Sequence, residues 1–327
     1  MNRSTSPING RAELAFIALA LVWGTSHVIT KNILTAHTPF FYTSLRFGLA
    51  ALCFGLLFAG HLRRARSREI RQGALLGLCS FAGIVCYTVG LVFTAASKAG
   101  FITGLYLVFT PLVAYAFFRT RPAADQLIGL AVAVVGFGIL SYPPGGAAFN
   151  WGDGLILGAA LAWAAHIAAT SAFARESDVK TLAATQVIVV AALAIAAHFI
   201  LRQAIGAAWP APFDRLLALE ARPNTLTMNT WLQIGYMALV VTFAAALLQT
   251  WAQGKAPATH AVLLYALEPV TAALFAWAVL GEQLTWRSAL GATLIVCGVL
   301  IARLGLWQRL NSQTANENAN KDALVRE

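Results

Sequence analysis

Ten long apolar segments constrain this chain more than any other feature of its sequence. They fall at 13–34, 39–60, 73–94, 98–118, 124–141, 153–173, 181–201, 230–252, 258–280 and 286–306. A helix needs about 20 mostly apolar residues to cross the roughly 30 Å hydrocarbon core of a bilayer. The segments are continuous rather than alternating, which excludes a transmembrane β-barrel, and a soluble core cannot bury so many apolar helices. The sequence therefore predicts an all-α membrane protein with ten transmembrane helices.

Composition and charge agree with this class. Hydrophobic residues make up 59% of the chain, charged residues only 11%, and the mean hydropathy is +0.70. With the N-terminus in the cytoplasm, 16 of the 23 Lys and Arg residues fall on that side, 6 fall outside, and Arg46 lies within a span. This bias predicts that both termini are cytoplasmic. The net charge of +10 is thus a topology and lipid-headgroup signal rather than a nucleic-acid surface.

The second half of the chain repeats the first. Superimposing position n on n+140 places Trp23 over Trp163 and Arg46 over Gln186. A shift of 158 aligns Gly77 with Gly235 and Pro111 with Pro269, and a shift of 162 aligns Gly129 and Gly136 with Gly291 and Gly298. Five spans is an odd number, so the second copy must enter the bilayer upside down. Inverted repeats are typical of carriers whose substrate site lies near the mid-plane, and the recurring glycines predict close helix packing.

The predicted organisation has four parts. A cytoplasmic N-terminus (1–12) precedes the first five-helix repeat (13–149), and the second repeat (150–310) is followed by a disordered cytoplasmic tail (311–327). An external insert, 203–229, separates spans 7 and 8. Its middle, 213–221, reads as a short interfacial amphipathic helix, and a variable surface loop is favoured over a lid. The four cysteines lie inside spans without metal-ligand spacing, so no disulfide, metal or cofactor is predicted.

Three segments carry recognisable motifs. They are ALVWGTSHVITK at 20–31, Phe-x-x-x-x-Arg-Phe at 41–47, and the Glu-Pro, Leu-Gly-Glu and Gly-x6-Gly series within 267–301. Together they resemble the EamA-type drug/metabolite transporter superfamily over about residues 13–306. The resemblance implies a ten-helix exporter of small metabolites, often amino acids, in a bacterial inner membrane, and bacterial aromatic amino-acid exporters look like the nearest kind. The first copy has Arg119-Thr-Arg-Pro in place of the Leu-Gly-Glu turn, which argues against a symmetric role for Glu282.

Two charged residues are predicted to lie deep within spans, where a charge costs about 2.5–3.5 kcal/mol. Glu268 is about ten residues into span 9, opposite Thr110 under the 158 shift. One interpretation is a group that couples protons or binds a substrate ammonium. The other is a structural residue that pairs with Arg46 or hydrogen-bonds into the backbone gap left by Pro269. Arg46 holds a substrate carboxylate, or it pairs with Glu268 or with carbonyl groups. Its counterpart in span 7, Gln186, favours a pathway-facing position for both.

Aromatic and imidazole side chains form two similar stripes at helical spacing. The stripes are Trp23, His27 and Lys31 on span 1, and Trp163, His166 and Thr170 on span 6. If the repeats share an axis, these stripes converge on a cavity, although a histidine in a helix is as often a hydrogen-bonded core residue. Tyr87, Tyr106 and Tyr265 lie at compatible depth and suit a planar solute, although each alone is more often a core residue. His27 and His166 join Glu268 as possible coupling groups.

These features predict a secondary carrier that exports a small amphipathic metabolite, with amino acids favoured and aromatic ones first, by alternating access. The alternative within the class is a proton-coupled multidrug or nucleoside exporter. An intramembrane enzyme is disfavoured because HExxH, GxSxG and Walker A motifs are absent from the sequence. A channel does not need inverted repeats or buried charges. The expected partners are a small-molecule substrate and the lipid bilayer, and a monomer is compatible with this architecture.

Overall fold

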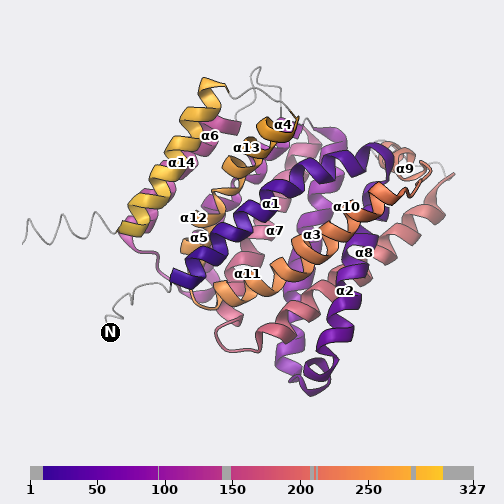
Figure 1. The fold of residues 1–327 in the computed structure, drawn as a ribbon, viewed down its shortest axis with the longest axis horizontal. Coiled ribbons are helices and arrows are strands. Elements are labelled where there is room, and N and C mark those ends of the chain that lie inside the picture. The colour runs from indigo at the N-terminus through magenta and orange to yellow at the C-terminus, as the bar shows by residue number, and fades with distance from the viewer. Residues whose placement is uncertain are drawn as a thin grey trace, which may run out of the picture.

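The computed structural model describes residues 10–94, 96–141, 149–206, 210, 213–280 and 285–304. The side chains of His27 and Lys31, the turn around Glu282, residues 1–9 and the tail 311–327 lie outside the described part. Every regular element in these ranges is helical, and ten of the segments are long and apolar enough to span a membrane (Figure 1). The prediction of an all-α protein with ten membrane helices is therefore confirmed.

Seven spans are single helices. They are α1 (Gly10–Ala36), α2 (Pro39–Arg64), α3 (Ser67–Phe93), α6 (Ala124–Ser141), α7 (Trp151–Phe173), α8 (Val179–Ala204) and α14 (Trp286–Leu304). Local sequence explains several of their ends. Pro39 begins α2, where its missing N–H costs nothing, and Asn150 and Asp153 form a reciprocal capping box at the start of α7.

The other three spans are interrupted. Span 4 consists of α4 (Ala96–Thr103) and α5 (Tyr106–Phe118), and span 9 of α12 (Ala258–Tyr265) and α13 (Glu268–Leu280). Span 8 consists of α10 (Met228–Ala238), a π-helical turn η1 (Leu239–Ala244) and α11 (Ala245–Gln253). The sequence predicted continuous helices here, because composition alone does not mark a two-residue break inside an apolar run.

The breaks in spans 4 and 9 correct the predicted alignment of the halves. The residue numbers that bound α4 and α5 all differ from those that bound α12 and α13 by 162, not by 158. The predicted pairing of Pro111 with Pro269 is wrong, because Pro111 lies inside α5 whereas Pro269 is the second residue of α13. Glu268 consequently corresponds to Tyr106 rather than to Thr110, and each is the first residue of the second half-helix.

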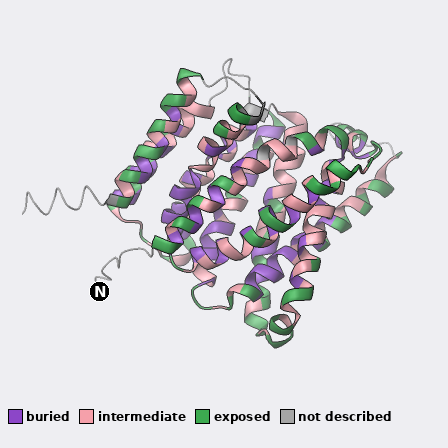
Figure 2. Cartoon of the chain, viewed as in Figure 1, coloured by how far each residue is buried: buried purple, intermediate pink, exposed green. Residues whose placement is uncertain are grey.

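Helices of the first half pack largely on helices of the second. α1 lies against α11, α12 and α13, and α7 lies against α3, α4 and α5. α2 pairs with α8 and α6 pairs with α14, and both pairs are visible in Figure 1. Exchanging the two halves converts the contacts of α1 into those of α7 and maps the α2–α8 and α6–α14 pairs each onto itself. Buried residues concentrate where these helices meet, as the purple segments in Figure 2 show.

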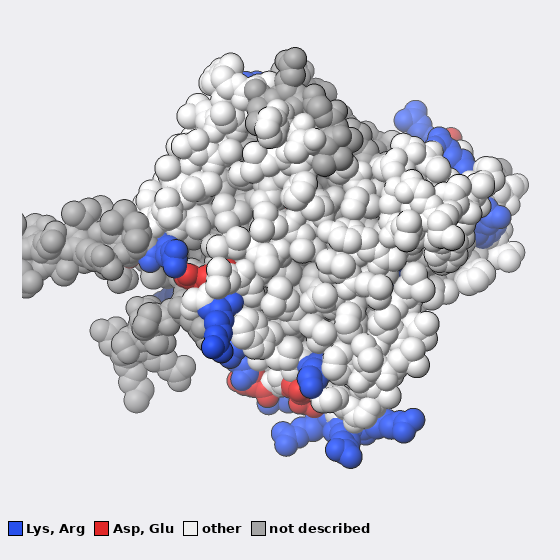
Figure 3. All heavy atoms as spheres, in the orientation of Figure 1, with Lys and Arg blue, Asp and Glu red and all other residues white. Residues whose placement is uncertain are grey.

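The charges mark the two ends of the bundle. We call the end at which α1 begins and α14 ends the terminal face, and the other end the opposite face. Figure 3 shows charged side chains along the lower-left and lower margins and again at the upper right, with a broad uncharged band between them. Large exposed apolar side chains such as Leu56, Phe117 and Leu232 suit contact with lipid acyl chains.

Glycines set the spacing of α6 and α14. A Cβ on Gly136 would lie 2.7 Å from the Gly291 carbonyl oxygen, and one on Gly291 would lie 2.6 Å from the Gly136 oxygen. Gly129 and Gly298 face each other in the same reciprocal way. The predicted packing role of these four glycines is confirmed, because only residues without a side chain let two backbones approach this closely.

A Gly298→Ala substitution is expected to lower the thermal unfolding temperature of the purified protein. The added methyl overlaps the Gly129 carbonyl, and overpacking of this kind costs about 1–3 kcal/mol. Gly55→Ala in α2 is the matched control, because no atom lies within 4 Å of its added Cβ. Equal unfolding temperatures for the two variants would contradict the proposed contact.

The insert between spans 7 and 8 contains the predicted short helix, α9 (Phe213–Glu220). Leu216 and Leu217 are buried against the bundle, whereas Phe213, expected on the same face, is exposed. The fully buried Glu220 accepts a hydrogen bond from the Phe40 amide at 2.9 Å, which satisfies a free N–H at the start of α2. The insert thus caps a helix of the first half, a role that its sequence did not reveal.

Candidate functional site

Trp23 on α1 and Tyr265 on α12 bring the two halves into aromatic contact. Their ring centroids lie 5.1 Å apart at an interplanar angle of 54°, and Phe16 meets Tyr265 edge-on at 5.5 Å. Tyr265 is fully buried, and its hydroxyl has no hydrogen-bond partner of good geometry although Gln249 lies near it. Trp23 is only partly buried and therefore keeps one part of its surface available.

Trp163 on α7 has a comparable arrangement with Tyr87 on α3. The ring centroids are 5.6 Å apart at 47°. The indole of Trp163 lies directly on Gly83, where a Cβ would be 2.6 Å from its Nε1 atom. A side chain at position 83 would displace the ring, so Gly83 positions Trp163. Both tryptophans predicted at the site therefore face tyrosines of the other half instead of turning away from the bundle.

Glu268 lies at the break in span 9. It is the first residue of α13, so its carboxylate is near the positive end of that helix's dipole. Tyr87, Tyr106 and Tyr265, which come from α3, α5 and α12, lie within electrostatic range of its carboxylate. Glu268 is therefore in the neighbourhood of residues that the sequence presented separately.

The start of α13 is anchored to α1. The Thr271 hydroxyl lies 2.7 Å from the Ala20 carbonyl oxygen and 2.8 Å from the Glu268 carbonyl oxygen. Gly24 lies against the same hydroxyl, and a Cβ there would come within 3.0 Å of the Ala272 nitrogen. Gly24 thus brings α1 and α13 together next to Trp23. Thr271 was not identified from the sequence, because its partner on α1 is far away along the chain.

Arg46 does not join this group. Its Nε donates to the Thr242 hydroxyl at 2.7 Å, its guanidinium lies 3.4 Å from the Tyr42 hydroxyl, and it packs over the Phe47 ring at 5.3 Å. No ion pair among the described residues joins Arg46 to Glu268, so that predicted alternative is wrong. Thr242 belongs to the π-helical turn and in turn donates to the Met237 carbonyl, so Arg46 braces the irregular part of span 8.

His166 and Gln186 form a buried polar chain. His166 Nε2 lies 2.8 Å from Gln186 Oε1, and Gln186 donates to the Thr250 hydroxyl at 3.2 Å. All three side chains are buried, which fits the alternative of a hydrogen-bonded core histidine. Under the shift of 140, the position on α1 that corresponds to His166 belongs to Ser26 rather than to His27.

Five of the ten predicted site residues lie in the region of Glu268. Tyr87, Tyr106 and Tyr265 are within electrostatic range of its carboxylate, and Trp23 and Trp163 contact the rings of Tyr265 and Tyr87. Arg46 and the His166–Gln186 pair lie in separate polar clusters, and the side chain of His27 is outside the described part. We call Trp23, Tyr87, Tyr106, Trp163, Tyr265 and Glu268 the central cluster. It combines one carboxylate with five aromatic rings, an arrangement suited to a cationic or zwitterionic solute with a planar part.

Two cavities are described, and both lie at the terminal face. One, of about 230 Å³, is bordered by α5, α7 and α12 and includes Arg175 and Glu176. The other, of about 340 Å³, lies at the turn between α2 and α3. Neither includes a residue of the central cluster, so the predicted central cavity is not among them.

Comparison with known proteins identifies the family. The EamA-like transporter family matches residues 10–142 and 150–304. An uncharacterized transporter of Archaeoglobus fulgidus is 33% identical over 293 residues, which cover 90% of this chain and 86% of that protein. The uncharacterized transporter YoaV of Bacillus subtilis is 24% identical over 303 residues, covering 89% and 96% of the two chains.

A crystal structure shares the fold. It superposes with a TM-score of 0.73 at 21% identity, and the match covers 92% of this chain and 99% of the other. At this identity the likeness concerns the fold alone. The matches to family and relatives extend over both halves and almost the whole membrane region. This multi-pass membrane protein therefore belongs to the EamA-like transporter family.

Proposed function

We propose that this transporter is a secondary carrier that exports small amphipathic metabolites, amino acids in particular and aromatic ones first. The observation that carries the proposal is the central cluster, in which Glu268 lies among three tyrosines and two tryptophans. A carboxylate attracts the ammonium group of an amino acid, and aromatic rings stack on a planar side chain. A bacterial inner membrane with both termini in the cytoplasm fits the charge bias of the loops.

Alternating access by two inverted five-helix repeats is part of this proposal. Its support is the common offset of 162 between the broken spans and the exchange of contacts between the halves. Discontinuous helices at the mid-plane are a recurring way to expose helix ends to a substrate in carriers. Tyr106 and Glu268 are the first residues of the two corresponding half-helices, α5 and α13. A substrate that contacts both breaks therefore acts on both halves of the carrier at once.

A flux assay in liposomes tests the function. The purified protein is reconstituted and offered each of the twenty amino acids, with nucleosides and a lipophilic cation as further substrates. Saturable uptake with counterflow of an amino acid is the expected result. If only nucleosides or the lipophilic cation show counterflow, the substrates are nucleosides or drugs rather than amino acids. Flux without saturation or counterflow would indicate a channel, and turnover of a labelled lipid or peptide would indicate an enzyme.

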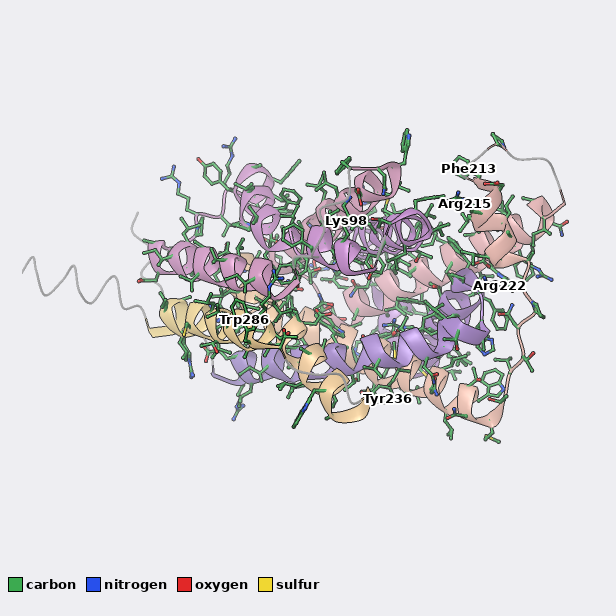
Figure 4. The ribbon with its side chains drawn as sticks, turned by 90° about the horizontal axis from the view of Figure 1, so that it is seen from above. Lys98, Phe213, Arg215, Arg222, Tyr236 and Trp286 are labelled. Carbon is green, nitrogen blue, oxygen red and sulfur yellow. The ribbon has the colours of Figure 1, made fainter. Side chains whose placement is uncertain are left out.

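Trp163→Ala is expected to weaken the apparent affinity for aromatic amino acids about 2- to 10-fold more than for aliphatic ones. This range corresponds to the roughly 0.5–1.5 kcal/mol of one aromatic pair. Trp286→Ala is the matched control, because Trp286 begins α14 and is 74% exposed (Figure 4). An equal loss for both substrate types would mean that Trp163 serves packing.

A further inference from the structure

Two acid–base pairs lie at opposite ends of the bundle in equivalent positions. Glu13 and Asp153 each lie in the first turn of the first helix of their half, α1 and α7, and their positions differ by 140. Lys98 and His260 each stand third in the first half-helix of a broken span, α4 and α12, and their positions differ by 162. Asp153 pairs with Lys98, whereas Glu13 pairs with Arg303 and has His260 3.7 Å away, beyond hydrogen-bond distance.

The pair at the opposite face is short and buried. Lys98 Nζ lies 2.6 Å from Asp153 Oδ2, and the Thr94 hydroxyl donates to Asp153 Oδ1 at 2.6 Å. The Asp153 side chain is 0% exposed and that of Lys98 is 16% exposed. Lys98 is labelled in Figure 4. The pair joins α4 of the first half to α7 of the second.

The pair at the terminal face is looser and has a third member. His260 Nε2 lies 3.7 Å from Glu13 Oε1, and Arg303 Nε lies 3.0 Å from Glu13 Oε2. The side chains of Glu13 and His260 are 13% and 4% exposed, whereas that of Arg303 is 59% exposed. This group joins α1 of the first half to α12 and α14 of the second. At the opposite face the half-helix, α4, belongs to the first half and the long helix, α7, to the second, so the two halves exchange roles between the two faces.

We propose that these pairs are the two gates of the carrier: Asp153–Lys98 closes the opposite face, Glu13–His260–Arg303 closes the terminal face, and they separate alternately. The inference rests on the proposed alternating access. Each gate is attached to a broken span whose other half-helix begins in the central cluster, at Tyr106 for α5 and at Glu268 for α13. A two-residue break lets α4 or α12 move while α5 or α13 stays with the substrate.

The geometry favours gates over static braces. A brace between the halves works at either end, whereas these pairs occupy equivalent positions at both ends. Asp153, Lys98, Glu13 and His260 are nearly shielded from solvent, whereas the Arg303 side chain is 59% exposed. Removal of Asp153 leaves the Lys98 ammonium, which is only 16% exposed, without this carboxylate, so the start of α4 is driven to open. By contrast, the Arg68–Glu176 pair also links the halves at the terminal face, but its side chains are 63% and 62% exposed. It therefore serves as the control.

Accessibility of a cysteine below the gates tests the proposal. In the full-length chain, Cys53, Cys79, Cys86 and Cys297 are replaced by serine and Leu105→Cys is introduced at the break in span 4. A membrane-impermeant maleimide is added separately to each side of the membrane. Asp153→Asn is expected to raise labelling from the opposite face at least fivefold and not from the terminal face. Glu13→Gln is expected to do the reverse, and Arg68→Gln to change neither rate.

A conservative substitution separates gating from loss of fold. Asp153→Glu, which keeps a carboxylate for Lys98 and for the Asn150 amide, is expected to keep the labelling rate within about twofold of the parent. His260→Lys, which makes the terminal pair resemble the other one, is expected to slow labelling from the terminal face. Labelling that rises equally from both sides in Asp153→Asn, or that does not change, overturns the proposal. The readout needs no substrate, so a positive result alongside failed amino-acid flux would reject only the proposed substrate class.

Discussion

Glu268→Gln is expected to weaken the apparent affinity for an amino-acid substrate about 10- to 100-fold. A hydrogen bond to a charged group contributes roughly 1.5–3 kcal/mol, and glutamine retains the shape of the side chain but not its charge. The substitution is also expected to abolish any pH dependence of net export while counterflow at saturating substrate persists. Radiolabelled flux in liposomes at several external pH values measures both effects.

The control for this variant is Asp214→Asn, which neutralises an exposed carboxylate on α9. It is expected to leave affinity and pH dependence unchanged. If Glu268→Gln keeps the pH dependence of the parent, Glu268 is not the coupling group, and the His166–Gln186 chain becomes the next group to test. If it keeps the affinity as well, the ammonium group binds elsewhere.

Gly24→Val is expected to prevent accumulation of a folded, monodisperse carrier. The new side chain would overlap the Thr271 hydroxyl and crowd the backbone of α13 at Ala272, where α1 and α13 are in contact. Overpacking at one methyl group already costs about 1–3 kcal/mol, and valine adds three carbon atoms. Size-exclusion profiles and thermal unfolding in detergent report the loss.

A complementary exchange tests whether the contact itself is responsible. Gly24→Ala alone is expected to destabilise the protein, and adding Thr271→Gly is expected to restore part of the lost unfolding temperature by vacating the space. Gly48→Ala is the matched helical control, since its added Cβ would meet only Ile195 at 3.9 Å. If the losses in unfolding temperature of the two single variants simply add in the double variant, with no rescue, α1 and α13 are not in contact at this point.

The sequence predicted the spans well and their interior poorly. Membrane helices follow from long apolar runs, so segments such as 153–173 appeared almost unchanged as Trp151–Phe173. The breaks at 104–105 and 266–267 were missed because their residues, Gly-Leu and Ala-Leu, are ordinary in an apolar helix. That omission led to the wrong shift of 158 for spans 4 and 9 and to the incorrect pairing of Glu268 with Thr110.

The site was predicted in composition but not in connectivity. Trp23, Trp163 and Glu268 stood out because aromatic and charged groups are unusual at mid-span. Their partners could not be assigned, since Tyr265 and Tyr87 come from spans that are adjacent only in the folded bundle. Arg46 is the clearest example. Its charge suggested Glu268 as a partner, yet it contacts the neutral hydroxyls of Thr242 on span 8 and of Tyr42 on its own helix.

The reciprocal glycines of α6 and α14 restrict how the molecule can change shape. Each backbone is seated against the carbonyl groups of the other at two levels, so translation of one helix along its neighbour would drive Cα atoms into oxygens. Tilting of one helix about this line of contact preserves the glycine contacts at both levels. The α6–α14 contact is therefore expected to act as a pivot, which makes a rocking motion much less costly than a piston-like one.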